Sequence, residues 1–382
     1  MKKVLIVDDS LTAREYLKYI IESAPDLCVA GEAKDGKEAV ELVKSLHPDI
    51  VSMDIEMPKM NGYKACRLIM ETMPVPIVMV SSSENYEQVA TSFKALEAGA
   101  LSVVEKPKGF GHKDAGIMVK KLIRTLRLMA DIKVVRRHQK KIIHYKKNDT
   151  LSRNTRDFFL PEKQRSSGIS VNSYVTEISD FFKNKDLLQK SRRIKFVVIG
   201  ASTGGPPAIK QCLSELDANF PAPILVVQHI TKGFLPGMLS WLDQAINLKC
   251  KIAEQNEIVQ NGHVYFAPDG YHMEINSKKQ ITLCHSLSTE AICPSVSRLF
   301  ASAAKFFGRN TAGVLLTGMG KDGAAELLTI RKKGGITIAQ DKESCVVFGM
   351  PGEAVRLNAA DLVLSPEKII KFLNSIELNS IE

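Results

Sequence analysis

Three side chains in the second half of the chain have the residue types and spacing needed for acyl-group chemistry. Ser202 lies in the sequence Gly200–Gly205, directly after the apolar run Phe196–Ile199. A serine on such a tight strand-to-helix turn exposes its hydroxyl, which can attack an acyl carbon when a histidine accepts its proton. His229 follows the next predicted strand, and Asp322 lies in a later turn that also follows a strand. We therefore expect a Ser202–His229–Asp322 catalytic triad.

The same residues also permit structural roles, and one of the turns permits a different class of enzyme. Ser202 and Asp322 could each cap a helix, and His229 could be a core residue. The turn Gly318–Gly323 matches the G-x-G-x-x-G pattern of dinucleotide-binding proteins, and Asp341 stands where an acid would bind the ribose. Because that pattern lies late in its domain and gives Ser202 and His229 no role, we favour the hydrolase interpretation.

A second group of reactive side chains lies in the first third of the chain. Asp8 and Asp9 follow the first predicted strand, Asp54 ends the third, Ser81 the fourth, and Lys106 follows the fifth. Three carboxylates at one sheet edge repel one another and favour a bound Mg²⁺. Asp54 then suits the role of phosphoryl acceptor, with Ser81 and Lys106 binding phosphoryl oxygens. A single acid at a strand end often only caps a helix, but three acids, a hydroxyl group and an ammonium group at one edge favour a phosphoryl site.

The elements that position this second group are predicted by alternating sequence patterns in residues 1–125. Short β-branched runs alternate with amphipathic helical segments such as Glu38–Leu46. Five strands, each followed by a helix, predict a doubly wound, flavodoxin-like parallel sheet whose strands all end at one edge. The predicted strands are Lys3–Val7, Leu27–Ala33, Ile50–Met53, Ile77–Ser81 and Ser102–Glu105.

Residues 194–375 show a second α/β pattern and predict a Rossmann-like domain, also doubly wound. Three runs in its middle, separated by turn residues, predict an antiparallel meander inserted in the parallel sheet. These runs are His263–Ala267, His272–Ile275 and Ile281–Cys284. The remaining predicted strands are Lys195–Ile199, Ile224–Gln228, Ala312–Thr317, Ile336–Ala339 and Leu362–Leu364.

Between the two domains, residues 126–193 form a polar, basic segment. Residues 120–150 hold eleven Lys or Arg and two acids, so they carry most of the net charge of +10. A DNA-binding regulator could use this charge, but no recognition unit accompanies it, and we predict no nucleic-acid partner. The stretch Tyr174–Leu188 has apolar residues at helical spacing and could be either a docking helix or part of the linker.

Composition places the chain among ordinary globular proteins, with 45% hydrophobic and 25% charged residues. No apolar run approaches the ~18 residues of a membrane span, and the start of the chain lacks a secretory signal pattern. Seven cysteines form no C-x-x-C pair. This usage is typical of reduced thiols, so we expect a cytoplasmic protein without membrane insertion.

The first domain resembles the receiver domain of two-component response regulators. The resemblance is carried by Val7–Ser10, Met53–Gly62, Val80–Ser82 and Glu105–Pro107. It implies that Asp54 accepts phosphate from a histidine kinase, and that Asp8, Asp9, Asp54 and the backbone carbonyl of Glu56 hold the metal. The family also permits a cis Lys106–Pro107 bond. The sequence departs from the family at Ser102, where receivers usually carry an aromatic switch residue.

The second domain resembles the catalytic domain of chemotaxis protein-glutamate methylesterases. The matching runs are Ile199–Pro206, Val227–His229, Ala267–Met273, Leu316–Ala324 and Ala339–Pro351. The resemblance implies the same triad, with the backbone amides of Thr203 and Met319 as oxyanion donors. The chain departs at Cys293–Ser297, where the family usually has an arginine first and an aspartate last.

Together the two resemblances imply a phosphorylation-activated hydrolase for sensory adaptation. Its substrates would be glutamate methyl esters and glutamines on methyl-accepting chemotaxis receptors, and its phosphodonor a chemotaxis histidine kinase. Mg²⁺ would be required in the receiver domain, and no cofactor in the catalytic domain.

Overall fold

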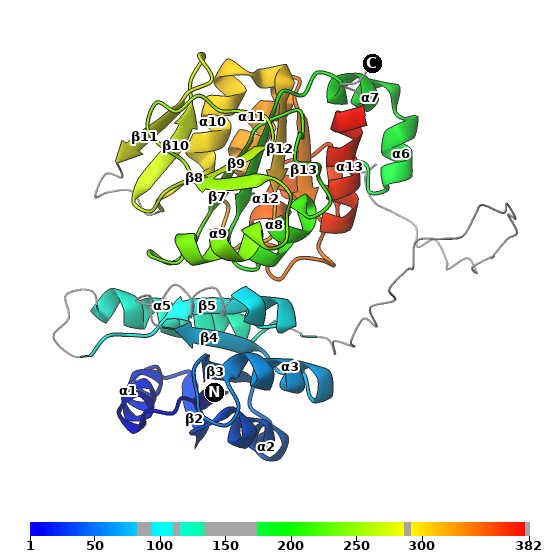
Figure 1. The fold of residues 1–382 in the computed structure, drawn as a ribbon. Helices are drawn as coiled ribbons and strands as arrows, with labels where there is room; N and C mark the ends of the chain where they lie inside the picture. Colours follow the sequence, from blue (N-terminus) through cyan, green and yellow to red (C-terminus); the bar gives the residue numbers. More distant parts are fainter. Residues whose placement is uncertain (82–92, 110–114, 133, 135–173, 286–291, 379–382) are drawn as a thin grey trace, which may run out of the picture.

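The computed structural model describes residues 1–81, 93–109, 115–132, 134, 174–285 and 292–378. Within these ranges the chain forms two parallel β-sheets, each covered by helices on both faces (Figure 1). The first sheet lies in the blue-to-cyan part of the chain and the second in the green-to-red part. Two α/β units with parallel sheets confirm the predicted fold class.

The first sheet has five parallel strands in the order β2-β1-β3-β4-β5. This order puts the earliest strand inside the sheet, so the chain winds first to one edge and then to the other. The strands are β1 (Lys2–Val7), β2 (Leu27–Ala33), β3 (Ile50–Asp54), β4 (Ile77–Ser81) and β5 (Ser102–Glu105). All five agree with the predicted strands to within one residue, because buried β-branched runs bounded by polar turns are a strong local signal.

Alternation along β1 divides the apolar side chains between the two faces of the first sheet. Leu5 and Val7 belong to one buried cluster, whereas Val4 and Ile6 belong to another. The helices on the Leu5 face are α2 (Gly36–Leu46) and α3 (Gly62–Thr72). Those on the Val4 face are α1 (Leu11–Glu22) and α5 (Ala115–Met129).

The second sheet has seven parallel strands in the order β14-β13-β12-β6-β7-β9-β8. Its first strand, β6 (Phe196–Ala201), lies at the centre between β12 and β7, so the carboxyl ends of these three strands are neighbours. The other strands are β7 (Ile224–Gln228), β8 (Lys249–Ile252), β9 (His263–Phe266), β12 (Thr311–Leu315), β13 (Ile336–Gln340) and β14 (Leu362–Leu364).

The prediction of a three-stranded antiparallel meander is wrong for one of its three strands. Of the three runs, the second and third, β10 (Tyr271–Ile275) and β11 (Ile281–His285), pair antiparallel with each other, as a separate two-stranded sheet. The run that begins at His263 is β9, which pairs parallel with both β7 and β8 in the main sheet. The turn residues between these runs do not show with which strand β9 pairs, because that choice depends on residues distant in sequence.

Helices cover both faces of the second sheet. One face carries α8 (Gly205–Leu213), α9 (Leu235–Asp243) and α13 (Pro366–Leu378). The other carries α10 (Val296–Phe306), α11 (Ala324–Lys332) and α12 (Met350–Arg356). A short 3-10 helix, Gly308–Asn310, leads into β12.

Part of the predicted linker packs on the second unit. Helices α6 (Ile178–Lys183) and α7 (Lys185–Ser191) follow a β-bridge between Val175 and Leu362. Phe181 is fully buried, with its ring centroid 5.2 Å from that of Phe372 on α13. These contacts favour the docking-helix alternative for this stretch, because burial of a large aromatic ring against another helix fixes its position.

Residues 135–150, which hold many of the lysines and arginines of the basic segment, lie outside the described residues. None of the helices that the structure describes is both long and apolar enough to cross a membrane. The permitted cis bond at Lys106–Pro107 is not observed, since within the described ranges the cis peptide is Cys293–Pro294.

Candidate active site and acidic cluster

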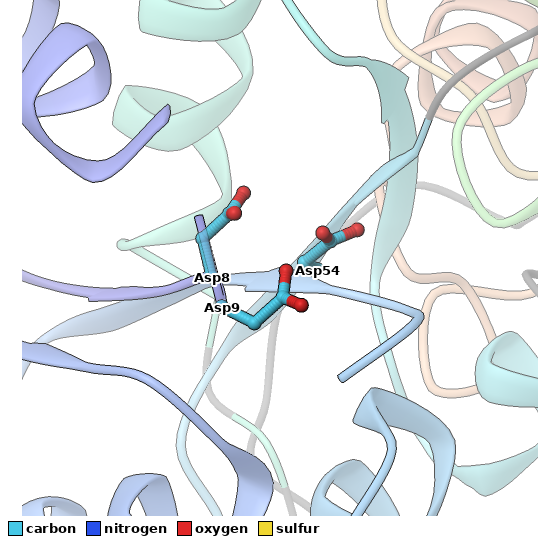
Figure 2. Close-up of side chains that lie close together, drawn as sticks. All are labelled: Asp8, Asp9 and Asp54. Atoms are coloured by element: carbon cyan, nitrogen blue, oxygen red, sulfur yellow. The ribbon is translucent and has the colours of Figure 1, made fainter. Parts of the chain in front are cut away.

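The predicted carboxylates of the first unit meet at the carboxyl edge of its sheet. Asp8 and Asp9 follow β1, and Asp54 ends the adjacent β3. One side-chain oxygen from each of the three lies within 4.8 Å of those from the other two. Figure 2 shows the three carboxylates gathered at these strand ends. Asp8 and Asp54 are buried, whereas Asp9 is exposed.

Lys106, which directly follows β5, contributes a positive charge to the cluster. Its Nζ lies 2.6 Å from Asp54 Oδ2 and 2.7 Å from Asp8 Oδ2. Ser81 ends β4, between β3 and β5, and its carbonyl accepts a hydrogen bond from the Lys106 amide at 2.8 Å. The predicted phosphoryl-binding residues therefore lie at the same edge as the carboxylates. Glu56 follows in the loop after β3, where it is exposed.

Burial and charge act in opposite directions on the acidic cluster. Burial raises the pKa of Asp54 to about 6, and the Asp8 carboxylate adds to the rise, while Lys106 and the Ile55 amide oppose it. Desolvation also opposes the charge on Lys106, but the two neighbouring carboxylates outweigh it and raise the pKa of the ammonium group. An additional cation at this edge would relieve the remaining repulsion between the carboxylates.

The acidic cluster fits a hard divalent cation. It offers oxygen ligands only, they lie close enough for one ion to bridge them, and the exposed Asp9 leaves an open side for water. Mg²⁺ prefers carboxylate oxygens and keeps several waters. Asp8, Asp9 and Asp54 would hold such an ion through their side chains.

In the second unit, Ser202 and His229 lie side by side at the end of neighbouring strands. Ala201 pairs with Gln228 in the register of β6 and β7, so the next residue of each strand is at the same level. The His229 amide donates to the Ala201 carbonyl at 2.9 Å. The Gln228 side-chain amide bridges the two turns, donating to the carbonyls of Ser202 and His229 at 2.8 Å each.

Asp322 reaches the same edge from the turn after β12. Its Oδ2 lies 2.9 Å from His229 Nε2. Three further donors come from the start of α10: the Ser295 hydroxyl and the Ser297 amide on Oδ1, and the Val296 amide on Oδ2. The carboxylate thus satisfies the first amides of α10 and holds the imidazole at the same time.

These hydrogen bonds keep Asp322 ionised. Burial by itself favours the neutral carboxyl group, but the hydrogen bonds from His229 and Ser297 outweigh it and hold the pKa of Asp322 well below its usual range. An ionised carboxylate beside a histidine stabilises the imidazolium that forms when the ring accepts a proton.

Ser202 occupies the tight turn predicted for a nucleophile. Its amide donates to the Thr317 carbonyl at 3.0 Å, and its hydroxyl forms no hydrogen bond with any residue that the structure describes. The amides of Thr203 and Met319 are likewise not donated to any described residue. A free hydroxyl and two free amides at one edge are the groups that an acyl-transfer site requires.

The dinucleotide-binding alternative fits this geometry poorly. The amides of Gly318 and Gly323, which would face a pyrophosphate, already donate to the Val347 carbonyl and the Ser297 hydroxyl. The Asp341 carboxylate accepts from the amide and hydroxyl of Ser344. Gly318 instead allows the chain to pass close to Ser202, because a Cβ at position 318 would lie 2.7 Å from Ser202 Cβ.

The first unit lies against this edge of the second (Figure 1). Two side chains of α5 contact loops of the candidate site. Lys121 Nζ donates to Thr231 Oγ1 at 2.8 Å, and Arg124 Nη2 lies 3.9 Å from Met319 Sδ. Further contacts join residues 93–97 to helices α8 and α9: the rings of Phe93 and Trp241 stack at 5.7 Å, and Lys210 is paired with Glu97.

Sequence reasoning missed the residues that hold Asp322. Ser295 and Ser297 flank Val296 just before an apolar helical run, which is a typical N-cap pattern. That pattern predicts the start of α10, but it does not show that the capping carboxylate comes from residue 322. It also missed Lys121 and Thr231, for which the sequence carries no pairing signal.

Each of the two units matches a known protein family. Residues 4–112 match the response regulator receiver domain, and residues 197–373 match the CheB methylesterase domain. A protein-glutamate methylesterase/protein-glutamine glutaminase from Nitrosospira multiformis is 43% identical over 376 residues, covering 98% of this chain and 97% of that protein. One from Pyrococcus horikoshii is 36% identical and covers 96% of this chain and 91% of that protein.

Two solved structures from Thermotoga maritima are similar to the separate units. The CheB methylesterase catalytic domain is 40% identical, with a TM-score of 0.46, and covers 48% of this chain and 98% of that one. The response regulator domain of CheB is 41% identical, with a TM-score of 0.32, and covers 35% of this chain and 98% of that one.

Proposed function

Because the chain belongs to the family of protein-glutamate methylesterases/protein-glutamine glutaminases with a receiver domain, we propose that it removes methyl groups from glutamate esters of chemotaxis receptors. It would also deamidate glutamines on these receptors. Both reactions transfer an acyl group to water through a tetrahedral intermediate, so one site serves both. The result would be sensory adaptation, in a protein that works in the cytoplasm.

In this proposal His229 takes the proton of the Ser202 hydroxyl while the serine oxygen bonds to the γ-carbonyl carbon of the substrate. The electron pair of the carbonyl bond moves to its oxygen. When the tetrahedral intermediate collapses, the imidazolium gives its proton to the leaving methoxy oxygen or amide nitrogen, which departs as methanol or ammonia. Water, deprotonated by the same histidine, then hydrolyses the acyl-enzyme. Asp322 stabilises the imidazolium through its 2.9 Å hydrogen bond.

The amides of Thr203 and Met319 would receive the oxygen of the tetrahedral intermediate. Neither amide donates to a described residue. Thr203 directly follows Ser202, and Met319 directly follows Gly318, which lies close to Ser202. Fixed donors at the position of developing charge are among the largest contributions to catalysis, and each is worth roughly 10²–10³ in rate.

The first unit would act as a receiver, with Asp54 accepting a phosphoryl group from a histidine kinase. Lys106 and Ser81 would bind the phosphoryl oxygens, and Asp8, Asp9, Asp54 and the Glu56 carbonyl would hold Mg²⁺. A bound Mg²⁺ neutralises the charge of the transferred group. The 2.6 Å ion pair between Lys106 and Asp54 supports this assignment. An ammonium group this close to the Asp54 carboxylate could bind an oxygen of a phosphoryl group attached there.

Regulation would act through the contact between the two units. Arg124 and Lys121 lie against the loops that carry Met319 and Thr231. In this proposal the unphosphorylated receiver would restrict access to Ser202. Phosphorylation at Asp54 would weaken this packing. Residues 1–125, 126–193 and 194–375 would then be receiver, linker and catalytic domain.

The observation that carries the proposed chemistry is the meeting of Ser202, His229 and Asp322 at one sheet edge. A serine-directed fluorophosphonate tests it. We expect covalent labelling of the intact chain at Ser202, faster after treatment with a small phosphodonor and Mg²⁺. Labelling of any other serine would contradict the assignment.

Occlusion by the receiver is tested with a fragment. Because residues 174–191 pack on the second unit, the fragment should begin at Tyr174 and end at Glu382. We expect it to release methanol from methylated receptor faster than the unphosphorylated intact chain does. Equal rates would contradict occlusion.

A further inference from the structure

The side chain of Gln228 holds one particular peptide group of the Ser202 turn. Gln228 is the last residue of β7, and only 4% of it is exposed. Its Nε2 group donates one hydrogen to the Ser202 carbonyl and the other to the His229 carbonyl, at 2.8 Å each. A carboxamide nitrogen carries two hydrogens, so both are used. These partners fix which way round the carboxamide lies, because an oxygen in place of the nitrogen would face two other oxygens.

The opposite side of the Gln228 carboxamide packs against the start of α8. A Cβ at position 205 would lie 2.1 Å from Gln228 Oε1, so Gly205 leaves the space that the carboxamide fills. The Oε1 atom is buried and accepts no hydrogen bond from the described residues. Gln228 therefore acts here as the donor of two hydrogen bonds, and close packing restricts the rotation of its carboxamide.

The Ser202 carbonyl belongs to the same peptide group as the Thr203 amide, which is a proposed oxyanion donor. This peptide is planar and trans, so its C=O and N–H bonds point in opposite directions. The carbonyl accepts from the Gly205 amide at 2.8 Å as well as from Gln228. Two donors on the oxygen set the plane of the peptide and hence the direction of the Thr203 N–H. They also draw electron density toward the oxygen, which makes the N–H a stronger donor.

We propose that Gln228 is a positioning residue for the reaction, because its carboxamide fixes and polarises the Ser202–Thr203 peptide and so directs the Thr203 amide at the oxyanion. Its second hydrogen bond, to the His229 carbonyl, ties this peptide to the turn of the neighbouring strand. The effect on rate rests on the proposed function, whereas the hydrogen bond to the peptide can be measured without any activity.

NMR of the full chain tests the hydrogen bond. The sequence holds two Ser–Thr pairs, Ser202–Thr203 and Ser288–Thr289. A chain with ¹³C in its serine carbonyls and ¹⁵N in its threonine amides therefore gives two signals that correlate these nuclei, and Thr289→Ser assigns them by removing one. We expect Gln228→Met, which keeps the length of the side chain but has no donor, to shift the Ser202–Thr203 signal. An unmoved signal would overturn the proposal.

Thr337→Val is the matched control for loss of a buried hydrogen bond. Thr337 is a buried residue of β13 whose hydroxyl donates to the Asp361 carboxylate and accepts from the Asp361 amide, at 3.0 Å each. We expect this variant to unfold at a lower urea concentration and to leave the Ser202–Thr203 signal in place. A shift of that signal equal to the shift in Gln228→Met would overturn the proposal, because it would follow from general destabilisation.

The effect on catalysis is measured by fluorophosphonate labelling of Ser202 and by methanol release from methylated receptor. We expect Gln228→Met to slow labelling by about 10²-fold, the usual cost of misplacing a reacting group by about 1 Å. In methanol release it should lower kcat and leave KM unchanged, whereas Thr337→Val should match the unsubstituted chain in both assays. Labelling of Gln228→Met at the rate of the unsubstituted chain would overturn the proposal.

A second variant reaches the same contact without altering Gln228. The Cβ of Gly205→Ala would lie 2.1 Å from Gln228 Oε1 and would displace the carboxamide. We expect it to shift the Ser202–Thr203 signal and to slow labelling of Ser202. If Gln228→Met does not fold, Gly205→Ala carries the test, and an unchanged signal and rate in it would overturn the proposal. No labelling of Ser202 in the unsubstituted chain would instead contradict the proposed function.

Discussion

Lys121 on α5 donates a hydrogen bond to Thr231, which lies two residues beyond His229, and the donor and acceptor atoms are 2.8 Å apart. This bond joins the helix that follows β5 of the first unit to the loop that carries a candidate catalytic residue of the second. Lys106, at the end of the same β5, contacts Asp54. The acidic cluster and the candidate active site are therefore connected through one strand, one helix and one loop.

Replacing Lys121 with alanine should raise the activity of the unphosphorylated chain. The change removes a hydrogen bond across the contact, which is worth roughly a 2- to 10-fold shift in an equilibrium. Methanol release from methylated receptor, before and after addition of a phosphodonor, measures the effect. Lys120→Ala is the matched control, since Lys120 is an exposed neighbour on the same helix. An equal change of activity in the Lys121→Ala and Lys120→Ala variants would contradict inhibition through the Lys121–Thr231 contact.

Ser202→Ala should abolish hydrolysis, with a loss of roughly 10⁶ in kcat, because it removes the oxygen that would form the proposed acyl-enzyme. Ser240→Ala, an exposed serine on α9, should retain full activity. Phosphorylation of Asp54 should proceed equally in both variants. Residual activity in Ser202→Ala within a factor of ten of the unsubstituted chain would exclude the serine as nucleophile.

Asp322→Asn should destabilise the fold in a pH-dependent manner. Asp322 has a lowered pKa in the folded chain, so its contribution is present above the unfolded value, about 3.8, and is lost as the pH falls below it. At pH 7 we expect a loss of about 1.5–3 kcal/mol, the value of hydrogen bonds to a charged group. Urea unfolding at pH 7 and pH 3.5 measures the difference between variant and parent, which should narrow at the lower pH. A constant difference would mean that Asp322 is not ionised in the fold.

Lys106→Met should destabilise the first unit most strongly without metal. The variant leaves Asp8 and Asp54 buried side by side with no counter-charge, at a cost of about 3 kcal/mol. Thermal unfolding in EDTA and in Mg²⁺ measures this. Mg²⁺ should raise the Tm of the variant more than that of the parent, because the ion replaces the missing cation. A smaller metal effect in the variant would contradict the cluster as the binding site.

Gly318→Ala should impair catalysis more than stability. The added Cβ would lie 2.5 Å from Met350 Sδ and 2.7 Å from Ser202 Cβ, so it would displace the serine turn. Misplacement of a reacting group by about 1 Å costs roughly 10² in rate. Gly116→Ala on α5 is the control, since its Cβ would meet nothing within 4 Å. Comparison of kcat with urea unfolding separates the two effects.

Much of the fold was predictable from sequence. The runs that became β1, β2, β4, β5, β7 and β14 have predicted and observed bounds that agree to within one residue. Each is an apolar, β-branched run between polar turns, and such a signal is local. By contrast, β8 was missed, because Lys249 and Lys251 interrupt its apolar character. It is the edge strand of its sheet, where charged residues face water.

The sequence by itself determined which chemical groups reach the two strand-end edges, because each of Asp8, Asp54, Ser202 and His229 is adjacent to its own predicted strand. Only the tertiary structure decided what these groups contact. The donors that hold Asp322, the ring nitrogen that faces it and the bond from Lys121 to Thr231 join segments that are 25 to 110 residues apart. Contacts over such separations depend on how whole elements pack, and a local pattern of residues carries no record of that packing.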